Sequence, residues 1–347
     1  MTKPFADHAT LHSLPMKTNL TELLSEHKIS PVLVDVGASE RPPAIWNDIA
    51  ACSTYVGFDP DEREMHEDKL AGFQRKVTVN MAVTADASAT AVEFFLTKSP
   101  FCSSTKVPNA PALASYLYAD LFVVEKTTQV GALTLNAAAR LAKVATFDWL
   151  KLDTQGTDLS IFKSLNDALG KSVLALDIEP GLRDAYVDED LFGDAHIHLT
   201  DNGFWPASIK TLGAIRMTDK AFDDLTRGMS PMAKKITEAS LQRSPCWCEA
   251  RYLRSLEWME ATGAGSREYL LLWTFAVLSQ QYGFALDVAR HVGDRIDRTL
   301  GDDLRKRSIS LIEHHTRNLP LRSPLTYLKV VTPPSLKALV KKVIGRA

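Results

Sequence analysis

Three short apolar segments, each with an aspartate at or near its end, constrain the fold of this chain most strongly. They are residues 31–36 with Asp35, residues 54–58 followed by Asp59, and residues 147–152 followed by Asp153. Short apolar runs bounded by turn residues are typical of strands buried in a parallel sheet. Segments with helical spacing lie between such runs, and this alternation predicts an α/β fold with a mostly parallel sheet.

The length and the change of pattern along the chain predict more than one part. The chain has 347 residues, which corresponds to about two domains. From about Ala233 onward helical spacing continues and no strand is evident. We therefore expect a lead-in at 1–30, an α/β domain at 31–230 and an all-helical C-terminal region at 231–347.

Composition excludes several classes of protein. Hydrophobic residues make up 45% and charged residues 24%, which are values of a globular chain rather than a disordered or collagenous one. The formal net charge of −2 gives no basic footprint for nucleic acid. The first twenty residues lack the apolar core of a secretory leader, and the four scattered cysteines are typical of reduced thiols. These features favour a cytoplasmic location.

The three aspartates are expected to meet at one edge of the sheet. Ligands of open α/β sheets bind beyond the carboxyl ends of the strands, where Asp35, Asp59 and Asp153 would lie. Gly37 follows the first strand directly and lets the backbone approach a ligand, while the N-terminus of the following helix would offer free N–H groups. A single glycine is not the G-x-G-x-x-G fingerprint, and Asp35 before it suits an ammonium or sulfonium better than a pyrophosphate. Both points disfavour a nicotinamide oxidoreductase.

Several motifs resemble the FkbM family of S-adenosylmethionine-dependent methyltransferases. The matching segments are Val34-Asp35-Val36-Gly37-Ala38, Gly57-Phe58-Asp59-Pro60-Asp61, Pro100-Phe101-Cys102-Ser103-Ser104, Pro108-Asn109, Leu150-Lys151-Leu152-Asp153-Thr154-Gln155-Gly156, Leu191-Phe192-Gly193-Asp194 and Asn202-Gly203-Phe204. The resemblance covers about residues 30 to 215. It implies a class I Rossmann-like methyltransferase sheet, and S-adenosyl-L-methionine as the cofactor.

The resemblance also implies roles for single residues. Gly37 and Ala38 would approach the methionine part of the cofactor, and Asp35 would lie near its ammonium or organise the turn. Asp59 would bind the ribose hydroxyls, as an acid after the second strand does in other doubly wound nucleoside sites. Asp153 would face the methionine or the substrate. The first motif continues as Ser39-Glu40-Arg41 and lacks the second glycine that many family members have.

Transfer of a methyl group to a hydroxyl benefits from a general base within hydrogen-bond distance. The candidates are first Asp153 and second Glu179, although Glu179 is equally well explained as an acid of the turn before Pro180-Gly181. Lys151 is expected to form a structural pair with a nearby acid. His196 and His198 would share one face of a strand, but no third ligand follows, so we expect no metal site.

The segment from Pro334 to Ala347 has apolar residues on one helical face, four basic residues opposite and no acid. This pattern fits a helix on the inner face of an anionic membrane, and it fits a helix docked on its own domain, which is the commoner case.

The sequence therefore predicts an O-methyltransferase acting on a small-molecule or glycan acceptor, such as a sugar of a surface glycan or a secondary metabolite. The alternative is a non-catalytic glycan-assembly or scaffold protein that retains the fold, and oligomeric state is left open.

Overall fold

The computed structural model describes residues 19–38, 42–60 and 72–332. The strands are β1 Val32–Val36, β2 Thr54–Phe58, β3 Arg75–Val79, β4 Ala82–Val83, β5 Ala91–Thr97, β6 Val124–Leu133, β7 Trp149–Leu152, β8 Ala175–Ile178, β9 Phe204–Ala214 and β10 Ser244–Arg254. The α-helices are α1 Leu20–Glu26, α2 Ala110–Leu113, α3 Leu135–Ala142, α4 Asp158–Lys163, α5 Asp167–Ser172, α6 Phe192–Asp201, α7 Asp219–Leu225, α8 Pro231–Ser240, α9 Leu256–Ala261, α10 Ser266–Leu278, α11 Tyr282–Arg295, α12 Arg298–Arg317, α13 Leu319–Arg322 and α14 Pro324–Val331. Three 3₁₀ helices are η1 Ala44–Cys52, η3 Pro100–Cys102 and η4 Ala119–Phe122.

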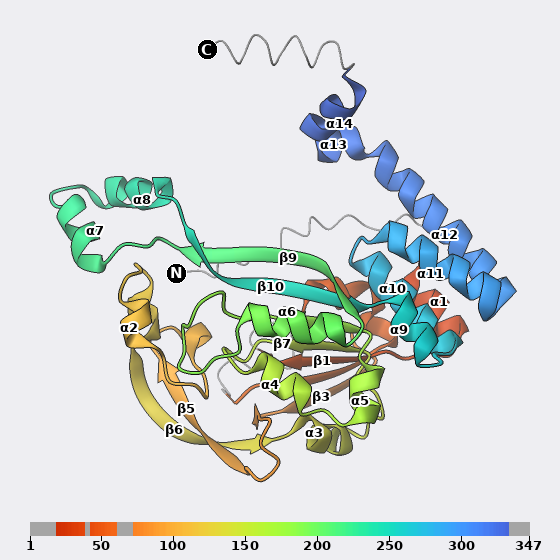
Figure 1. The fold of residues 1–347 in the computed structure, drawn as a ribbon, viewed down its shortest axis with the longest axis horizontal. Coiled ribbons are helices and arrows are strands. Elements are labelled where there is room, and N and C mark those ends of the chain that lie inside the picture. The colour runs from red at the N-terminus through yellow and green to blue at the C-terminus, as the bar shows by residue number, and fades with distance from the viewer. Residues whose placement is uncertain (1–18, 39–41, 61–71, 333–347) are drawn as a thin grey trace.

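A seven-stranded, mostly parallel sheet forms the centre of the molecule (Figure 1). Its strand order is β3-β2-β1-β7-β8-β10-β9, and all neighbours from β3 to β8 pair in parallel. Only β10 runs antiparallel, to β8 on one side and β9 on the other. The predicted mixed α/β architecture with a mostly parallel sheet is confirmed.

The order of the strands creates a switch point between β1 and β7. The chain leaves β1 for β2 and β3 on one side, and it later fills the other side with β7 and β8. At such a point the connections diverge to opposite faces of the sheet, which opens a crevice at the carboxyl ends of the two central strands.

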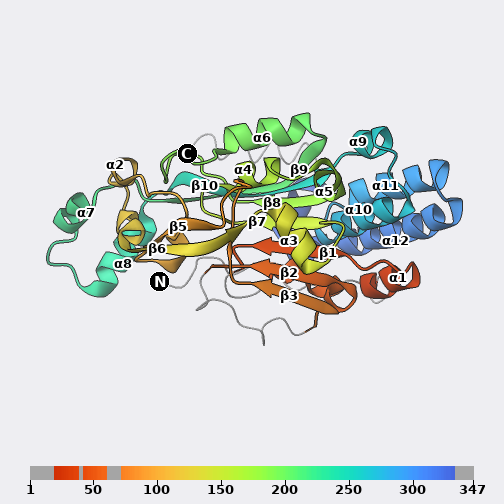
Figure 2. The same cartoon turned by 90° about the horizontal axis from the view of Figure 1, so that it is seen from below.

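Helices cover both faces of the sheet (Figure 2). Because successive side chains of a strand point to opposite faces, Val34, Leu150 and Leu176 pack with α3 to α6 in one hydrophobic cluster. Leu33, Trp149 and Leu253 pack with α1, η1 and α10 in the other. The apolar strand segments are therefore buried on both sides, as their sequences predict.

A second, three-stranded sheet of order β4-β6-β5 is inserted between β3 and β7. The long β5–β6 pair curves away from the central sheet in Figures 1 and 2. The connection between β5 and β6 contains η3, α2 and η4.

The region from residue 231 onward is not all helical, contrary to the prediction. Strand β10 occupies residues 244–254 and belongs to the central sheet. Cys246, Cys248 and Ala250 are buried while their neighbours are less so, which is the period of a strand. The apolar residues Leu253, Leu256 and Met259 continue across the end of β10 into α9, and this spacing imitates a single helix.

Helix α10 is buried all round. All ten residues from Tyr269 to Leu278 are buried, between the sheet on one side and α11 and α12 on the other. A helix that is apolar on every face is stable only in such a position. The predicted amphipathic segment 334–347 lies outside the described residues. Among the residues that are described, no helix is long and apolar enough to cross a membrane.

The packing of α10 leads to a stability prediction. Leu272→Ala should lower the free energy of unfolding by about 2–5 kcal/mol, because Leu272 is fully buried and the change leaves a cavity. Urea unfolding followed by circular dichroism measures this loss. The control Met232→Ala removes a side chain that is 68% exposed and should change the value by less than about 0.5 kcal/mol. Equal effects would contradict the buried position of α10.

Candidate functional site

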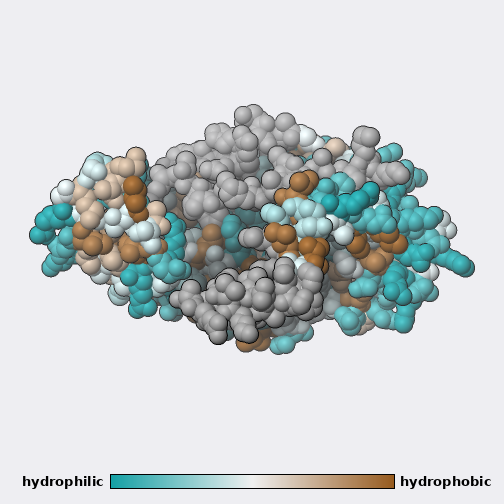
Figure 3. All heavy atoms as spheres, turned by 90° about the horizontal axis from the view of Figure 1, so that it is seen from above, coloured by the Kyte–Doolittle hydropathy of each residue, from teal (hydrophilic) through white to brown (hydrophobic). Residues whose placement is uncertain are grey.

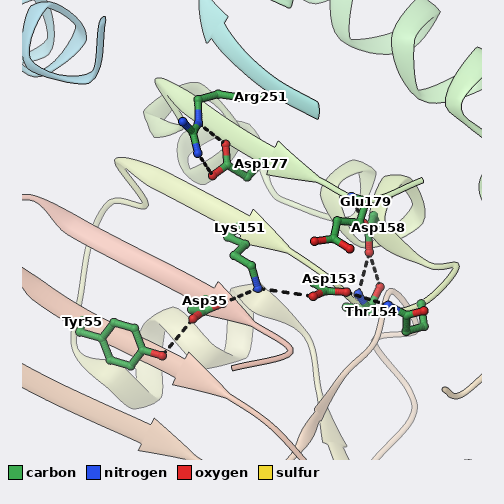
Figure 4. A network of polar contacts seen from close by, with 10 residues as sticks. Asp35, Tyr55, Lys151, Asp153, Thr154, Asp158, Asp177, Glu179 and Arg251 are labelled. Atoms are coloured by element: carbon green, nitrogen blue, oxygen red, sulfur yellow. Dashed lines mark hydrogen bonds and ion pairs between the residues drawn. The ribbon is translucent and has the colours of Figure 1, made fainter. Parts of the chain in front are cut away.

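One charged side chain on each of four adjacent strands forms a row across the sheet (Figure 4). In register from β1 to β10 the row is Asp35, Lys151, Asp177 and Arg251, so the signs alternate. The guanidinium of Arg251 donates two hydrogen bonds to the carboxylate of Asp177, at 2.7 and 2.9 Å. Such a bidentate pair holds both side chains in one geometry.

Lys151 lies at the centre of the site, across the switch point. Its Nζ is 3.0 Å from Oδ1 of Asp35 on β1 and 3.7 Å from Oδ2 of Asp153 at the end of β7. The second oxygen of Asp35 accepts a hydrogen bond of 3.1 Å from the hydroxyl of Tyr55 on β2. The expected structural pairing of Lys151 with an acid is confirmed, and the pair joins the three strands β2, β1 and β7.

The electrostatics of this cluster depend on the balance between burial and charge. Burial by itself lowers the pKa of Lys151, but the carboxylates of Asp35, Asp153 and Glu179 outweigh burial and raise that pKa. Lys151 is therefore charged at neutral pH. Burial raises the pKa of the Tyr55 hydroxyl, and the charges of Asp35 and Asp59 raise it further, so Tyr55 remains a hydrogen-bond donor to Asp35.

The turn after β1 brings the backbone of β1 against that of β7. Gly37 has φ +78°, and a Cβ at this position would lie 2.2 Å from the carbonyl oxygen of Asp153. Only glycine fits there without strain. The N–H groups of Gly37 and Ala38 both donate to the carbonyl oxygen of Phe58, at 2.9 and 3.0 Å. These two N–H groups therefore fasten the turn to the end of β2.

Asp59 follows β2 directly and is only 7% exposed. Its N–H donates to the carbonyl oxygen of Val79, and its carbonyl oxygen accepts a hydrogen bond of 3.0 Å from the side-chain amide of Asn80. The end of β2 is thus fastened to the end of β3. The negative charge of Asp59 raises the pKa of Tyr55, which links Asp59 electrostatically to the cluster around Lys151.

The turn after β7 is held by the segment between β5 and β6. Oδ1 of Asp153 accepts a hydrogen bond of 2.8 Å from the side-chain amide of Gln155, and Oε1 of Gln155 accepts one of 3.1 Å from the hydroxyl of Tyr186. The hydroxyl of Ser104 donates to the carbonyl oxygen of Gln155 at 2.7 Å. The segment with Cys102, Ser103 and Ser104 therefore packs directly on the turn that presents Asp153.

Asp158 joins the turn after β7 to the end of β8. Its Oδ1 accepts hydrogen bonds from the N–H and the hydroxyl of Thr154, at 2.9 and 2.5 Å. Its Oδ2 accepts the N–H of Glu179 at 2.8 Å. The half-buried side chain of Glu179 has no hydrogen bond or ion pair with the part of the chain that the structure describes. Burial, reinforced by the charge of Asp153, raises the pKa of Glu179 well above its usual range.

The structure brings together most of the residues that the sequence singles out. Asp35, Asp153 and Glu179 surround Lys151, while Gly37 and Ala38 form the turn beside Asp153. Asp158 also lies just beyond a strand end, as its position in the sequence predicts. Tyr55 and Tyr186 were not predicted, because they look like ordinary core aromatics in sequence.

The two histidines considered as a metal pair lie on a helix, not on a strand. Both belong to α6, where residues two apart point in different directions. Nδ1 of His196 is 2.9 Å from the hydroxyl of Tyr252, and the ring of His198 packs edge-on against Phe162. Within the described residues, no group of three or more His, Cys, Asp or Glu side chains is arranged to hold a metal ion.

No protein-family model matches the chain, and a search of curated proteins finds no match.

The close approach at Gly37 can be tested by adding a single methyl group. Gly37→Ala should lower the free energy of unfolding by more than Gly263→Ala, a control whose φ is +70° and whose Cβ would meet nothing within 4 Å. The control should lose about 1–2 kcal/mol of unfolding free energy, because alanine is disfavoured in the left-handed backbone region. Gly37→Ala should lose about 1–3 kcal/mol more, because its methyl group clashes with Asp153. Urea unfolding of both variants measures the difference. Equal losses would mean that β1 and β7 do not meet at this turn.

The charge of Lys151 should be needed for stability in a pH-dependent way. Lys151→Met leaves the carboxylates of Asp35 and Asp153 without their cation, and should lower the free energy of unfolding by about 3–5 kcal/mol at pH 8. In the variant the buried Asp35 prefers its neutral form, so the folded state binds more protons than the unfolded state and the loss shrinks as pH falls toward 5. Denaturation at several pH values measures this slope. Lys171→Met is the reference, because it breaks an exposed ion pair with Asp167. It should lower the free energy of unfolding by less than about 0.5 kcal/mol. A pH-independent loss at Lys151 would contradict the assigned network.

Proposed function

We propose that this chain is an S-adenosylmethionine-dependent methyltransferase that transfers a methyl group to a hydroxyl of a small-molecule or glycan acceptor. The observation on which the proposal rests is the order and direction of the seven strands, together with the acidic site at their switch point. The resemblance of residues 30–215 to the FkbM family points the same way.

The topology supports the proposal because it matches the class I methyltransferase sheet. Numbered only within the central sheet, β1, β2, β3, β7, β8, β9 and β10 are strands one to seven, and their order is 3-2-1-4-5-7-6 with the seventh antiparallel. Class I methyltransferases have this order and this single reversed strand. A wholly parallel doubly wound sheet of a nicotinamide enzyme would have no reversed strand at that position.

The residues at the switch point fit the chemistry of the cofactor. When bound, S-adenosylmethionine supplies a methyl group on a positively charged sulfonium, next to a ribose and an amino acid. Asp59, buried at the end of β2, has the position and charge to accept the two ribose hydroxyls. Gly37 has no side chain, so the turn after β1 packs directly against the backbone of Asp153 and lies beside the crevice. The backbone of Asp153 lies against the turn of Gly37, which makes Asp153 the candidate for the amino end.

Asp35 has a positioning role in this proposal. Its side chain is 1% exposed, and both carboxylate oxygens are hydrogen-bonded, one to Lys151 and one to Tyr55. It therefore organises β1 and orients Lys151, which in turn holds Asp153. Of the two alternatives for Asp35, organisation of the turn is favoured over contact with an ammonium.

Glu179 is favoured over Asp153 as the base. The carboxylate of Asp153 already accepts a hydrogen bond from Gln155 and lies near Lys151. Glu179 lies beside Asp153 at the same edge, and its raised pKa makes it a better acceptor of a proton near neutral pH. In this role Glu179 receives the proton that the acceptor hydroxyl loses.

A non-catalytic protein with the same fold is the second candidate. The observation in its favour is that the N–H groups of Gly37 and Ala38 donate to Phe58 and so are not available to a cofactor. Such a protein would not bind S-adenosylmethionine at physiological concentrations.

Calorimetry separates the two candidates. The parent chain should bind S-adenosylmethionine, and Asp59→Ala should weaken binding more than tenfold, because it removes charge-assisted hydrogen bonds worth about 1.5–3 kcal/mol. Asp167→Ala, which removes an exposed acid of α5, is the matched control and should bind like the parent. No heat of binding for the parent at millimolar cofactor would exclude the methyltransferase. Unchanged affinity of Asp59→Ala would show that the ribose contact is assigned to the wrong residue.

A further inference from the structure

The C-terminal helices leave the core partway along α12. The last buried residue of the described chain is Leu311, and beyond it none of the residues whose exposure is described is buried. Helices α13 and α14 project away from the central sheet in Figure 1. We call residues 312–332 the C-terminal arm.

The arm exposes apolar side chains to an unusual extent. Leu321 is 85% exposed and Val330 70%, and Tyr327, Leu328 and Val331 are exposed as well. Single exposed apolar residues are ordinary, but five within eleven positions form a patch. Figure 3 views the molecule from the face toward which the arm projects in Figure 1, and hydrophobic atoms lie among hydrophilic ones on this face.

From residue 314 onward, all the Lys, Arg, Asp and Glu positions of the chain are basic. Residues 314–347 contain seven Lys and Arg and no Asp or Glu, namely Arg317, Arg322, Lys329, Lys337, Lys341, Lys342 and Arg346. The remaining 313 residues therefore have 33 basic and 42 acidic residues, a formal charge of −9 for a chain whose total is −2. The basic residues are segregated at the same end as the exposed apolar ones.

A second projection on the molecule provides a contrast. Helices α7 and α8 lie at the opposite end in Figure 1 and also expose apolar side chains, with Met232 at 68% and Ile236 at 62%. Their charges are mixed, since Asp219, Asp223, Asp224 and Glu238 accompany Lys220, Arg227, Lys234 and Lys235. Exposure of apolar groups alone does not distinguish the two ends, but the charges do, because the only acid of the arm is Glu313, which pairs with Arg317, and no acid follows it in the sequence.

We propose that the C-terminal arm docks on an anionic lipid bilayer. Exposed apolar side chains and an excess of Lys and Arg in the same stretch of sequence are the two features that membrane-surface helices combine. Nucleic acid would satisfy the cations but would leave Leu321, Leu328 and Val330 in water. A second copy of the chain would bring two basic arms together. The proposal is independent of the methyltransferase assignment, because it uses none of the residues of the strand-edge site.

Vesicle co-sedimentation of the full chain tests the proposal. The chain should bind vesicles of phosphatidylcholine mixed with phosphatidylglycerol, should not bind phosphatidylcholine alone, and should be released by high salt. Leu321→Ser/Val330→Ser should weaken binding by about tenfold, because two apolar side chains no longer enter the interface. Both residues are exposed, so the variant should unfold at the same urea concentration as the parent.

The matched control is Met232→Ser/Ile236→Ser, which removes an equally exposed apolar pair from α8 and should bind vesicles like the parent. Equal loss in both double variants would overturn the proposal, as would equal binding to both kinds of vesicle or no binding at all. Analytical ultracentrifugation without lipid adds one outcome. A dimer that is lost in Leu321→Ser/Val330→Ser would identify the arm as a self-association surface and would overturn lipid docking.

Discussion

The interaction on which the site depends is the contact of one ammonium with carboxylates from two strands. Lys151 contacts Asp35 on β1 and Asp153 at the end of β7, so it spans the switch point of the sheet. A buried carboxylate without a cation would be costly, and Lys151 offsets part of that cost for Asp35, whose pKa burial still raises. The hydroxyl of Tyr55 on β2 donates a hydrogen bond to the other oxygen of Asp35, so β2 is joined to the same cluster.

The turns around Lys151 are each fastened to a neighbouring strand end. Gly37 and Ala38 are bonded to Phe58, Asp59 to Val79, and Glu179 to Asp158. The edge of the sheet is therefore built as one connected set of turns rather than as independent loops. A site of this kind holds its acids in fixed positions before any ligand arrives, which is what a methyl transfer requires of an enzyme that acts mainly by positioning.

The sequence predicts the parts of this structure that follow from local patterns. Strand β1, which contains Asp35, and strands β2 and β7, which precede Asp59 and Asp153, can be recognised because each is a short apolar run before a turn residue. Strand β10 was missed because it borders α9, and the apolar residues of the two elements together imitate helical spacing. The hydrogen bonds of Tyr55, Tyr186 and Ser104 could not be predicted, because they join segments that are far apart in the chain and meet only in the folded sheet.

The central claim is that the strand-edge cluster around Lys151 is a binding site for S-adenosylmethionine. A crystal structure of the chain grown with S-adenosylhomocysteine tests it most directly. Our account predicts electron density beyond the ends of β1 and β2, with the ribose hydroxyls within hydrogen-bond distance of the carboxylate of Asp59 and the amino-acid end beside Gly37 and Asp153. Density for the compound elsewhere on the molecule, or an empty strand edge at saturating concentration, would contradict the account.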